Sequence, residues 1–287
     1  MNGLCNVWDF TDWIKSTESW HKMKEKKQRK TNAEQLLIVE KLRPIDDGFF
    51  EVMMEDPDTC EELLQIFMEK ADLKIRKDTV TGQKSIHIIG KRSIRVDAYA
   101  EGEEDVVYNI EIQKADNDNH VKRVRYNASA ITVNRSEPGD RFEHVQEVYI
   151  IYVSNFDVLQ NGRTISHAEM ICKETGESLQ DGLHEIYVTT TGKEDNKIAR
   201  LMKEFLNPDM NNPEFPKTSR RVQAMKHDPK EVAIVCKAIE EYADKRAIET
   251  AIETYQECGI SRDIIAQKIK NRFALSDDQI AAYLKTE

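Results

Sequence analysis

Residues 93–113, SIRVDAYAEGEEDVVYNIEIQ, contain the pattern that decides the fold. Apolar and polar residues alternate on both sides of a turn rich in Gly and acidic residues, which predicts two antiparallel strands. A turn centred near Glu104 places Asp97 almost opposite Glu111, and residues paired in this way lie about 5 Å apart. By the same alternation, Glu111 and Gln113 share the polar face of the second strand.

Two carboxylates this close repel each other unless a cation lies between them. Mg²⁺ suits such a pair, because it binds oxygen ligands and commonly takes only one or two protein carboxylates, with water and phosphate completing its shell. The nearest histidines in sequence offer no alternative base: we expect His87 to point outward from a strand and His120 to be solvated at a helix start. The sequence contains no Ser/His/Asp triad pattern, P-loop or HExxH motif, which argues against acyl hydrolases, nucleoside triphosphatases and zinc proteases.

The surrounding sequence predicts an α/β fold with a mixed central sheet. Residues 45–70 have helical periodicity interrupted at Pro57, with Asp58 as the expected N-cap of the second helix. Periodicity then changes to that of strands up to Gln113, and returns to helical in residues 117–134. A strand buried on both faces follows, then a further strand, before helices continue to the end of the chain: VQEVYIIYVSNF (145–156) and GLHEIYVTTT (182–191).

Several segments together resemble one protein family. D-A-Y-A (97–100) followed by Y-N-I-E-I-Q (108–113) resembles the D-x(n)-E-x-Q core of the PD-(D/E)XK nuclease superfamily, in particular its transposase-like branch, the recombination-promoting nuclease (Rpn) group. The resemblance extends in order over about residues 44–235. Asp47–Met54 is similar to the family's opening D-x-x-F-K-x-x-F helix, with Glu51 where Lys is usual. Arg123–Ser129 is similar to its R-x-x-Y-x-x-S helix, and residues 138–162 are similar to its G-x-x-Y…I-x-I…D strand and turn.

The resemblance implies a restriction-endonuclease-like core of α-β-β-β-α-β type that binds Mg²⁺, or Mn²⁺ in its place, and hydrolyses DNA phosphodiester bonds. By this analogy Asp97, Glu111 and the backbone carbonyl of Ile112 are the metal ligands. Gln113 occupies the position where the superfamily usually has Lys. Since Gln orients groups only by hydrogen bonds and carries no charge, the site is expected to be a variant one.

Two further groups of residues have alternative interpretations. Asp47 either supplies a third carboxylate from the first helix or caps that helix. The predicted helix 117–134 either presents a polar stripe to DNA phosphates or packs that stripe on the sheet, the latter mainly through Tyr126. The candidate DNA contacts are Lys122, Arg123, Arg125 and Tyr126.

Three parts are expected along the chain. Residues 1–43 form a partly helical arm with a basic cluster, residues 44–210 the nuclease-like domain, and residues 211–287 a helical C-terminal region. This last region should contain a long helix near Pro229–Cys258 and two short helices that start at Ser261 and Ser276. The short helices form either a helix-turn-helix for DNA or a means of homo-oligomerisation or autoregulation. Asp277 and Asp278 at the start of the second one disfavour a groove-binding role.

The overall charge limits how DNA can be held. The 287 residues include 42 Lys and Arg against 52 Asp and Glu, a formal net charge of −10, so contact with DNA is expected to be local and salt-sensitive. The five scattered cysteines and the lack of a long apolar run indicate a cytoplasmic protein without a membrane partner. The second functional hypothesis is a DNA-binding or recombination accessory protein with this fold and no useful activity, which the net charge, Glu51 and Gln113 favour.

Overall fold

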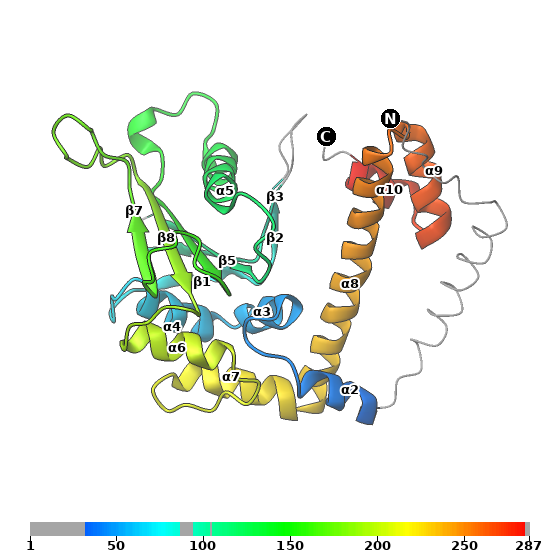
Figure 1. The fold of residues 1–287 in the computed structure, drawn as a ribbon, viewed down its shortest axis with the longest axis horizontal. Coiled ribbons are helices and arrows are strands. Elements are labelled where there is room, and N and C mark those ends of the chain that lie inside the picture. The colour runs from blue at the N-terminus through cyan, green and yellow to red at the C-terminus, as the bar shows by residue number, and fades with distance from the viewer. Residues whose placement is uncertain (1–31, 87–93, 104, 285–287) are drawn as a thin grey trace. The chain divides into compact units, whose positions relative to one another are not determined.

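The computed structural model describes residues 32–86, 94–103 and 105–284 (Figure 1). Most of the predicted N-terminal arm (1–43), including its basic cluster, lies outside these residues, and so does His87. The chain divides into two compact units. One consists of Ile38–Ala238, and the other contains Ile239–Glu287 together with Met1–Leu37.

A six-stranded mixed sheet forms the centre of the first unit, in the order β1-β4-β5-β6-β8-β7. β4, β5 and β1 are antiparallel neighbours, β6 and β8 run parallel to β5, and β7 closes the far edge antiparallel to β8. Its strands are β1 (Ile75–Thr81), β4 (Ala98–Gly102), β5 (Val107–Gln113), β6 (Val148–Ser154), β7 (Ile165–Ala168) and β8 (Leu183–Thr189). A separate two-stranded sheet pairs β2 (Lys84–Ile86) with β3 (Ile94–Val96). The expected α/β class with a mixed sheet is confirmed.

The two strands that the sequence did not predict are the edges of the sheet. β1 has the sequence IRKDTVT and is largely exposed, and β7 has only four residues. Edge strands are often short or polar, so they lack the apolar alternation that identifies a strand buried on one face. By contrast β6, a central strand of the sequence VYIIYVS, is buried on both faces as predicted.

Helices cover both faces of this sheet (Figure 1). α5 (His120–Arg135) covers one face, where its Val124 and Ile131 belong to the same apolar core as Ile150 and Tyr152 of β6. The other face packs against α3 and α4, and these pack in turn against α6 and α7. The bounds of these helices are α3 (Asp47–Met54), α4 (Pro57–Phe67), α6 (Lys197–Phe205) and α7 (Pro216–His227), with α2 (Asn32–Val39) preceding them and a short 3₁₀ turn η1 (Phe142–His144) before β6.

The predicted helix pair is present, but the N-cap of its second helix was assigned wrongly. Asp56, not Asp58, caps α4: its Oδ2 accepts the Thr59 amide at 3.0 Å and the Thr59 hydroxyl at 2.6 Å. Pro57 then occupies the first helical position, where its fixed φ is favourable and no amide donor is needed. Asp58 instead pairs with Lys77 at 2.6 Å.

Two buried charged side chains anchor α7 within the first unit. Glu62 of α4 accepts the backbone amides of Lys217 and Thr218 at 3.1 and 2.7 Å, which satisfies the free donors at the α7 N-terminus. Near the other end of α7, Lys226 donates from Nζ to three backbone carbonyls, those of Val39, Glu40 and Leu42, at 2.8, 2.9 and 2.8 Å. These carbonyls lie at and just beyond the end of α2, so Lys226 connects α7 to the chain that enters the sheet domain.

The C-terminal unit is helical, as expected. It contains α8 (Pro229–Glu257) from Ile239 onward, followed by α9 (Arg262–Phe273) and α10 (Asp277–Leu284), and their shared core includes Ile252, Ile269 and Leu284. Ser261 and Ser276 lie at the predicted helix starts, and Ser276 Oγ accepts the Gln279 amide at 3.2 Å. In the part of the chain that the structure describes, no helix is both long enough and apolar enough to span a bilayer.

Candidate active site

The register of β4 and β5 brings Asp97 and Glu111 together. Ala98 pairs with Ile110, so Asp97, one residue before β4, comes level with Glu111. The Ile112 amide donates to Asp97 Oδ2 at 3.0 Å, which fixes the carboxylate at this end of the hairpin. The cross-strand placement expected from the alternating pattern is therefore present, with the difference that Asp97 lies in a bend between β3 and β4.

Glu111 is buried, although the alternation suggested a polar face. Its side chain is 1% exposed, and Asn109 Nδ2 donates to its Oε1 at 2.9 Å. β5 lies between β4 and β6 with helices over both faces, so even the polar side of this strand is covered. Glu111 shares a face with Tyr152, its register partner on β6, and that face packs against α5.

Burial and mutual repulsion disfavour ionisation of this pair. Burial is the main cause that raises the pKa of Glu111, to about 8, and the negative charge of Asp97 adds to it. The Asn109 hydrogen bond and the charges of Arg123 and Arg95 act in the opposite direction. Burial likewise raises the pKa of Asp97. A divalent cation between the two groups would remove this penalty, because it favours the ionised form of both.

The donor atoms fit a hard divalent ion. The N–H and C=O of one strand residue point to the same side, so the Ile112 carbonyl faces the Asp97 side together with its amide. Two carboxylates and one carbonyl, completed by water and phosphate, match the ligand preference of Mg²⁺. Within the described residues there is no cluster of three or more His, Cys, Asp or Glu that could hold a metal ion. The candidate protein ligands at this place are Asp97, Glu111 and the Ile112 carbonyl.

Gln113 connects the end of β5 to α5. Its Nε2 donates to the Ala115 carbonyl at 2.8 Å, and its Oε1 accepts from Arg123 NH1 at 3.2 Å. Both hydrogen-bonding groups of the amide are thus engaged, which fixes the orientation of Gln113 beside the carboxylate pair.

Asp47 is the first residue of α3 and does not cap it. The N-cap position belongs to Asp46, whose Oδ2 accepts the Arg43 amide at 2.8 Å, so the capping interpretation of Asp47 is wrong. Asp47 Oδ2 lies 3.4 Å from Lys114 Nζ. Its negative charge also adds to the rise in the pKa of Asp97, which indicates that the start of α3 lies close to the pair.

The candidate DNA contacts on α5 separate into two groups. Arg123 is half-buried against Gln113, whereas Lys122 and Arg125 are exposed and Tyr126 is 37% exposed. Tyr126 is not among the residues of α5 that are buried. The packing on the sheet is done by other residues of the helix, among them Val124, Ala128 and Ile131.

Residues that the sequence interpretation did not select also surround the site. Arg95 NH2 lies 3.4 Å from Glu51 Oε1, the carboxylate at the position where the family usually has Lys. His120 is 5% exposed, contrary to the expected solvated position, and its ring contacts Tyr152 Oη at 2.8 Å and Asp116 Oδ1 at 3.1 Å. The contacts of Arg95 with Glu51 and of His120 with Tyr152 join residues far apart in sequence, so no local sequence pattern indicates them.

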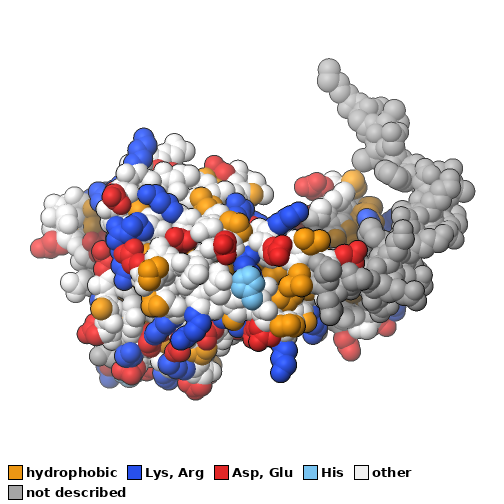
Figure 2. Space-filling view, turned by 90° about the horizontal axis from the view of Figure 1, so that it is seen from below, with side chains coloured by type: hydrophobic (Ala, Val, Ile, Leu, Met, Phe, Trp, Pro, Cys, Tyr) orange, Lys and Arg blue, Asp and Glu red, His pale blue; other side chains and the backbone are white. Residues whose placement is uncertain are grey.

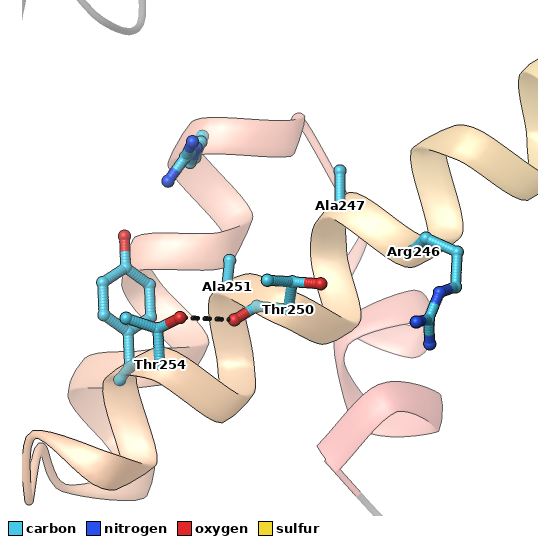
Figure 3. A pocket seen from close by; sticks show the side chains of 7 residues that line it. Arg246, Ala247, Thr250, Ala251 and Thr254 are labelled. Carbon is cyan, nitrogen blue, oxygen red and sulfur yellow. Dashed lines mark hydrogen bonds between the residues drawn. The ribbon is translucent and has the colours of Figure 1, made fainter. Parts of the chain in front are cut away.

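A concave site of the C-terminal unit is unrelated to the carboxylates. A pocket of about 440 Å³ lies along α8 and α9, and Thr254 Oγ1 there donates to the Thr250 carbonyl at 2.7 Å (Figure 3). Its lining contains no acidic side chain: Arg246, Ala247, Thr250, Ala251, Thr254, Tyr255 and Arg272. On the face drawn in Figure 2, basic and acidic side chains are interspersed.

The fold and the site together define a nuclease-like α/β protein, with a carboxylate pair, one member buried and one half-buried, at the end of a central strand and a helix over it. A family model described as PD-(D/E)XK nuclease family transposase matches residues 55–251, a span that includes Asp97, Glu111, Gln113 and α5. The chain belongs to this family, as its motifs indicated. Comparison with curated proteins and with solved structures gives no significant match.

Proposed function

We propose that the protein is a metal-dependent DNA endonuclease of the recombination-promoting nuclease type, which hydrolyses phosphodiester bonds with Mg²⁺, or with Mn²⁺ in its place. One observation supports this above all: two carboxylates, the half-buried Asp97 and the buried Glu111, are held level at one end of the β4–β5 hairpin. Placing two carboxylates this close together costs free energy unless a cation binds between them. Membership of a nuclease family points to DNA as the substrate.

Each residue of the site has a definable task in this proposal. Asp97, Glu111 and the Ile112 carbonyl hold the metal, which when bound polarises a phosphate oxygen and lowers the pKa of a water molecule. Asn109 orients Glu111 through the 2.9 Å hydrogen bond, and the Ile112 amide orients Asp97. Asp47 adds a negative charge from α3 that strengthens attraction for a cation.

DNA is expected to lie across the exposed side of α5. Lys122 and Arg125 supply positive charge there, and Tyr126 supplies a hydroxyl and a ring. Contacts of this kind to phosphates position DNA without selecting sequence.

A plasmid-nicking assay tests the activity. The purified protein should convert supercoiled plasmid to open-circular and linear forms with Mg²⁺ or Mn²⁺ and not with EDTA. Asp97→Asn and Glu111→Gln should each abolish the conversion, while the exposed carboxylates Asp72 and Glu177 provide controls as Asp72→Asn and Glu177→Gln. Cleavage that survives both site variants would show a contaminating nuclease and contradict the proposal.

The accessory-protein hypothesis is favoured by the net charge of −10, by Glu51 and by the uncharged Gln113 at the usual Lys position. It predicts that wild-type protein binds DNA but does not cleave it with either metal, and that Asp97→Asn and Glu111→Gln leave binding unchanged. The assay of the wild-type protein is therefore sufficient to distinguish the two functions.

We further propose a cytoplasmic location and self-association through α9 and α10. Cys60 and Cys172 are free thiols, in keeping with a reducing compartment. α10 starts with two acidic residues, Asp277 and Asp278, which disfavours DNA recognition, and α9 exposes 49% of Ile264. Sedimentation velocity of the full chain should show a dimer or larger species that Ile264→Asp dissociates. A monomer at all concentrations would contradict self-association.

A further inference from the structure

The site lacks a positive charge from the strand that carries Glu111. Gln113 is neutral, and Lys114 extends to Asp46 and Asp47, with Nζ–Oδ distances of 3.2 and 3.4 Å. The transition state of phosphodiester hydrolysis places extra negative charge on the phosphate, next to two carboxylates. A cation that reaches this phosphate must therefore come from another element.

Arg123 is placed to supply that cation. It lies in the first turns of α5, the helix that covers the Glu111 face of the sheet, and it is half-buried. Its NH1 donates to Gln113 Oε1 at 3.2 Å, and its charge favours the ionised form of both Asp97 and Glu111. The other arginine with this effect, Arg95, already pairs with Glu51. Arg123 thus combines a hydrogen bond to the motif position with proximity to both candidate ligands.

We propose that Arg123, held by Gln113, takes the place of the motif lysine and donates to the scissile phosphate during cleavage. This inference rests on the proposed function. In the step itself, a water oxygen forms a bond to phosphorus and releases one proton to solvent water, the bond from phosphorus to the 3′-oxygen breaks, and the departing oxygen takes a proton from solvent water. Arginine stays protonated throughout, so its part is electrostatic and hydrogen-bonding, and its planar fork matches two phosphate oxygens. Gln113 is a positioning residue, since it acts through Arg123.

Arg125 provides a matched comparison two residues further along α5. It is exposed, and two residues correspond to about 200° around a helix, so it points away from the site. Arg123→Gln and Arg125→Gln remove the same charge from the same helix. We expect the first to lower kcat by about 10²–10³, the effect of removing one electrostatic donor, with little change in KM. The second should raise KM and preserve kcat.

A charge-relocation variant separates catalysis from structure. Gln113→Lys restores lysine at the motif position. The double variant Arg123→Gln, Gln113→Lys should therefore have a kcat at least tenfold higher than that of Arg123→Gln alone. A purely structural role of Arg123 would not be rescued in this way. Arg123→Lys, which retains charge but loses the fork, should have an intermediate kcat.

Mn²⁺ binding without DNA gives a second readout, by isothermal titration calorimetry. Removing a cation beside two carboxylates should tighten Mn²⁺ binding several-fold in Arg123→Gln, and Arg125→Gln should bind Mn²⁺ as wild type does. Weaker Mn²⁺ binding in Arg123→Gln would show a damaged site and overturn the inference.

The outcomes distinguish the inference from the function on which it rests. Wild-type protein without metal-dependent cleavage overturns both. Wild-type cleavage that persists in Arg123→Gln, or a loss that Gln113→Lys does not recover, overturns the role of Arg123 and leaves the nuclease function standing.

Discussion

The backbone amide of Ile112 donates a 3.0 Å hydrogen bond to Oδ2 of Asp97. Pairing of β4 with β5 ends at Ala98, so a side-chain carboxylate takes the place of the backbone carbonyl that a longer β4 would have offered. The bond therefore satisfies a strand amide and orients a candidate metal ligand at once.

Glu111 should make the stability of the metal-free protein depend on pH. Its ordinary pKa is 4.5, and burial together with Asp97 raises the pKa to about 8. Between these values the folded protein retains a proton that the unfolded chain has released, so the free energy of unfolding falls as pH rises from about 4.5 to about 8. Urea denaturation in EDTA across this range should show a shallower decline for Glu111→Gln than for wild type. Identical slopes in the two proteins would contradict the raised pKa.

Stabilisation by metal ions should increase with pH, the reverse of the trend expected for the metal-free protein. Ligand carboxylates must be ionised to bind, so Mg²⁺ or Mn²⁺ should raise Tm more at pH 8 than at pH 5. EDTA should reverse the shift, and both Asp97→Asn and Glu111→Gln should remove it. A Tm shift in these variants equal to that of wild type would mean that the metal binds at another site.

Lys226 should contribute strongly to the stability of the fold. It is far from the carboxylates in sequence. It is 3% exposed and donates to the carbonyls of Val39, Glu40 and Leu42, and burial lowers its pKa. Lys226→Met leaves these carbonyls without the ammonium group, and we expect a loss of about 3 kcal/mol in the free energy of unfolding. Lys230→Met, at an exposed position just beyond α7, should change it by less than about 0.5 kcal/mol. Similar losses in both variants would refute the anchoring role.

Asp56 and Asp58 should differ in their contribution to α4. Asp56 accepts the Thr59 amide as the N-cap, so Asp56→Ala should cost about 1 kcal/mol. Asp58 forms an exposed ion pair with Lys77, and Asp58→Ala should cost about 0.5 kcal/mol or less. Chemical denaturation of both variants checks the order. A larger loss from Asp58→Ala would favour the cap that the sequence suggested.

Binding of DNA through the exposed side of α5 should appear in its salt dependence. Each phosphate contact contributes about 0.9 to the slope of log K against log salt concentration. Replacing Lys122 and Arg125 by Gln should therefore reduce the slope by about 2, measured by fluorescence anisotropy on duplex DNA with Ca²⁺ to prevent cleavage. Lys230→Gln serves as the control, and an unchanged slope in the double variant would remove DNA from this surface.

Local pattern was sufficient for the central hairpin. Alternation on both sides of a short turn specifies the register of its two strands, and this register places Asp97 level with Glu111. Motif order was sufficient for the family. The edge strands β1 and β7 were not predicted from the sequence because they are polar or short. The N-cap of α4 was assigned to the wrong residue because Asp56 and Asp58 both flank Pro57.

The sequence by itself determined the α/β class, the family, the carboxylate pair and the helical C-terminal region, because each depends on residues close together along the chain or on an ordered set of motifs. Only the tertiary structure decided that Glu111 is buried, that Arg123 meets Gln113, that Lys114 reaches Asp47 and that Glu51 pairs with Arg95. These contacts join elements distant in sequence, and they depend on how α3 and α5 pack against the sheet. Burial and electrostatic environment follow from that packing, and so does the chemistry that the pair can perform.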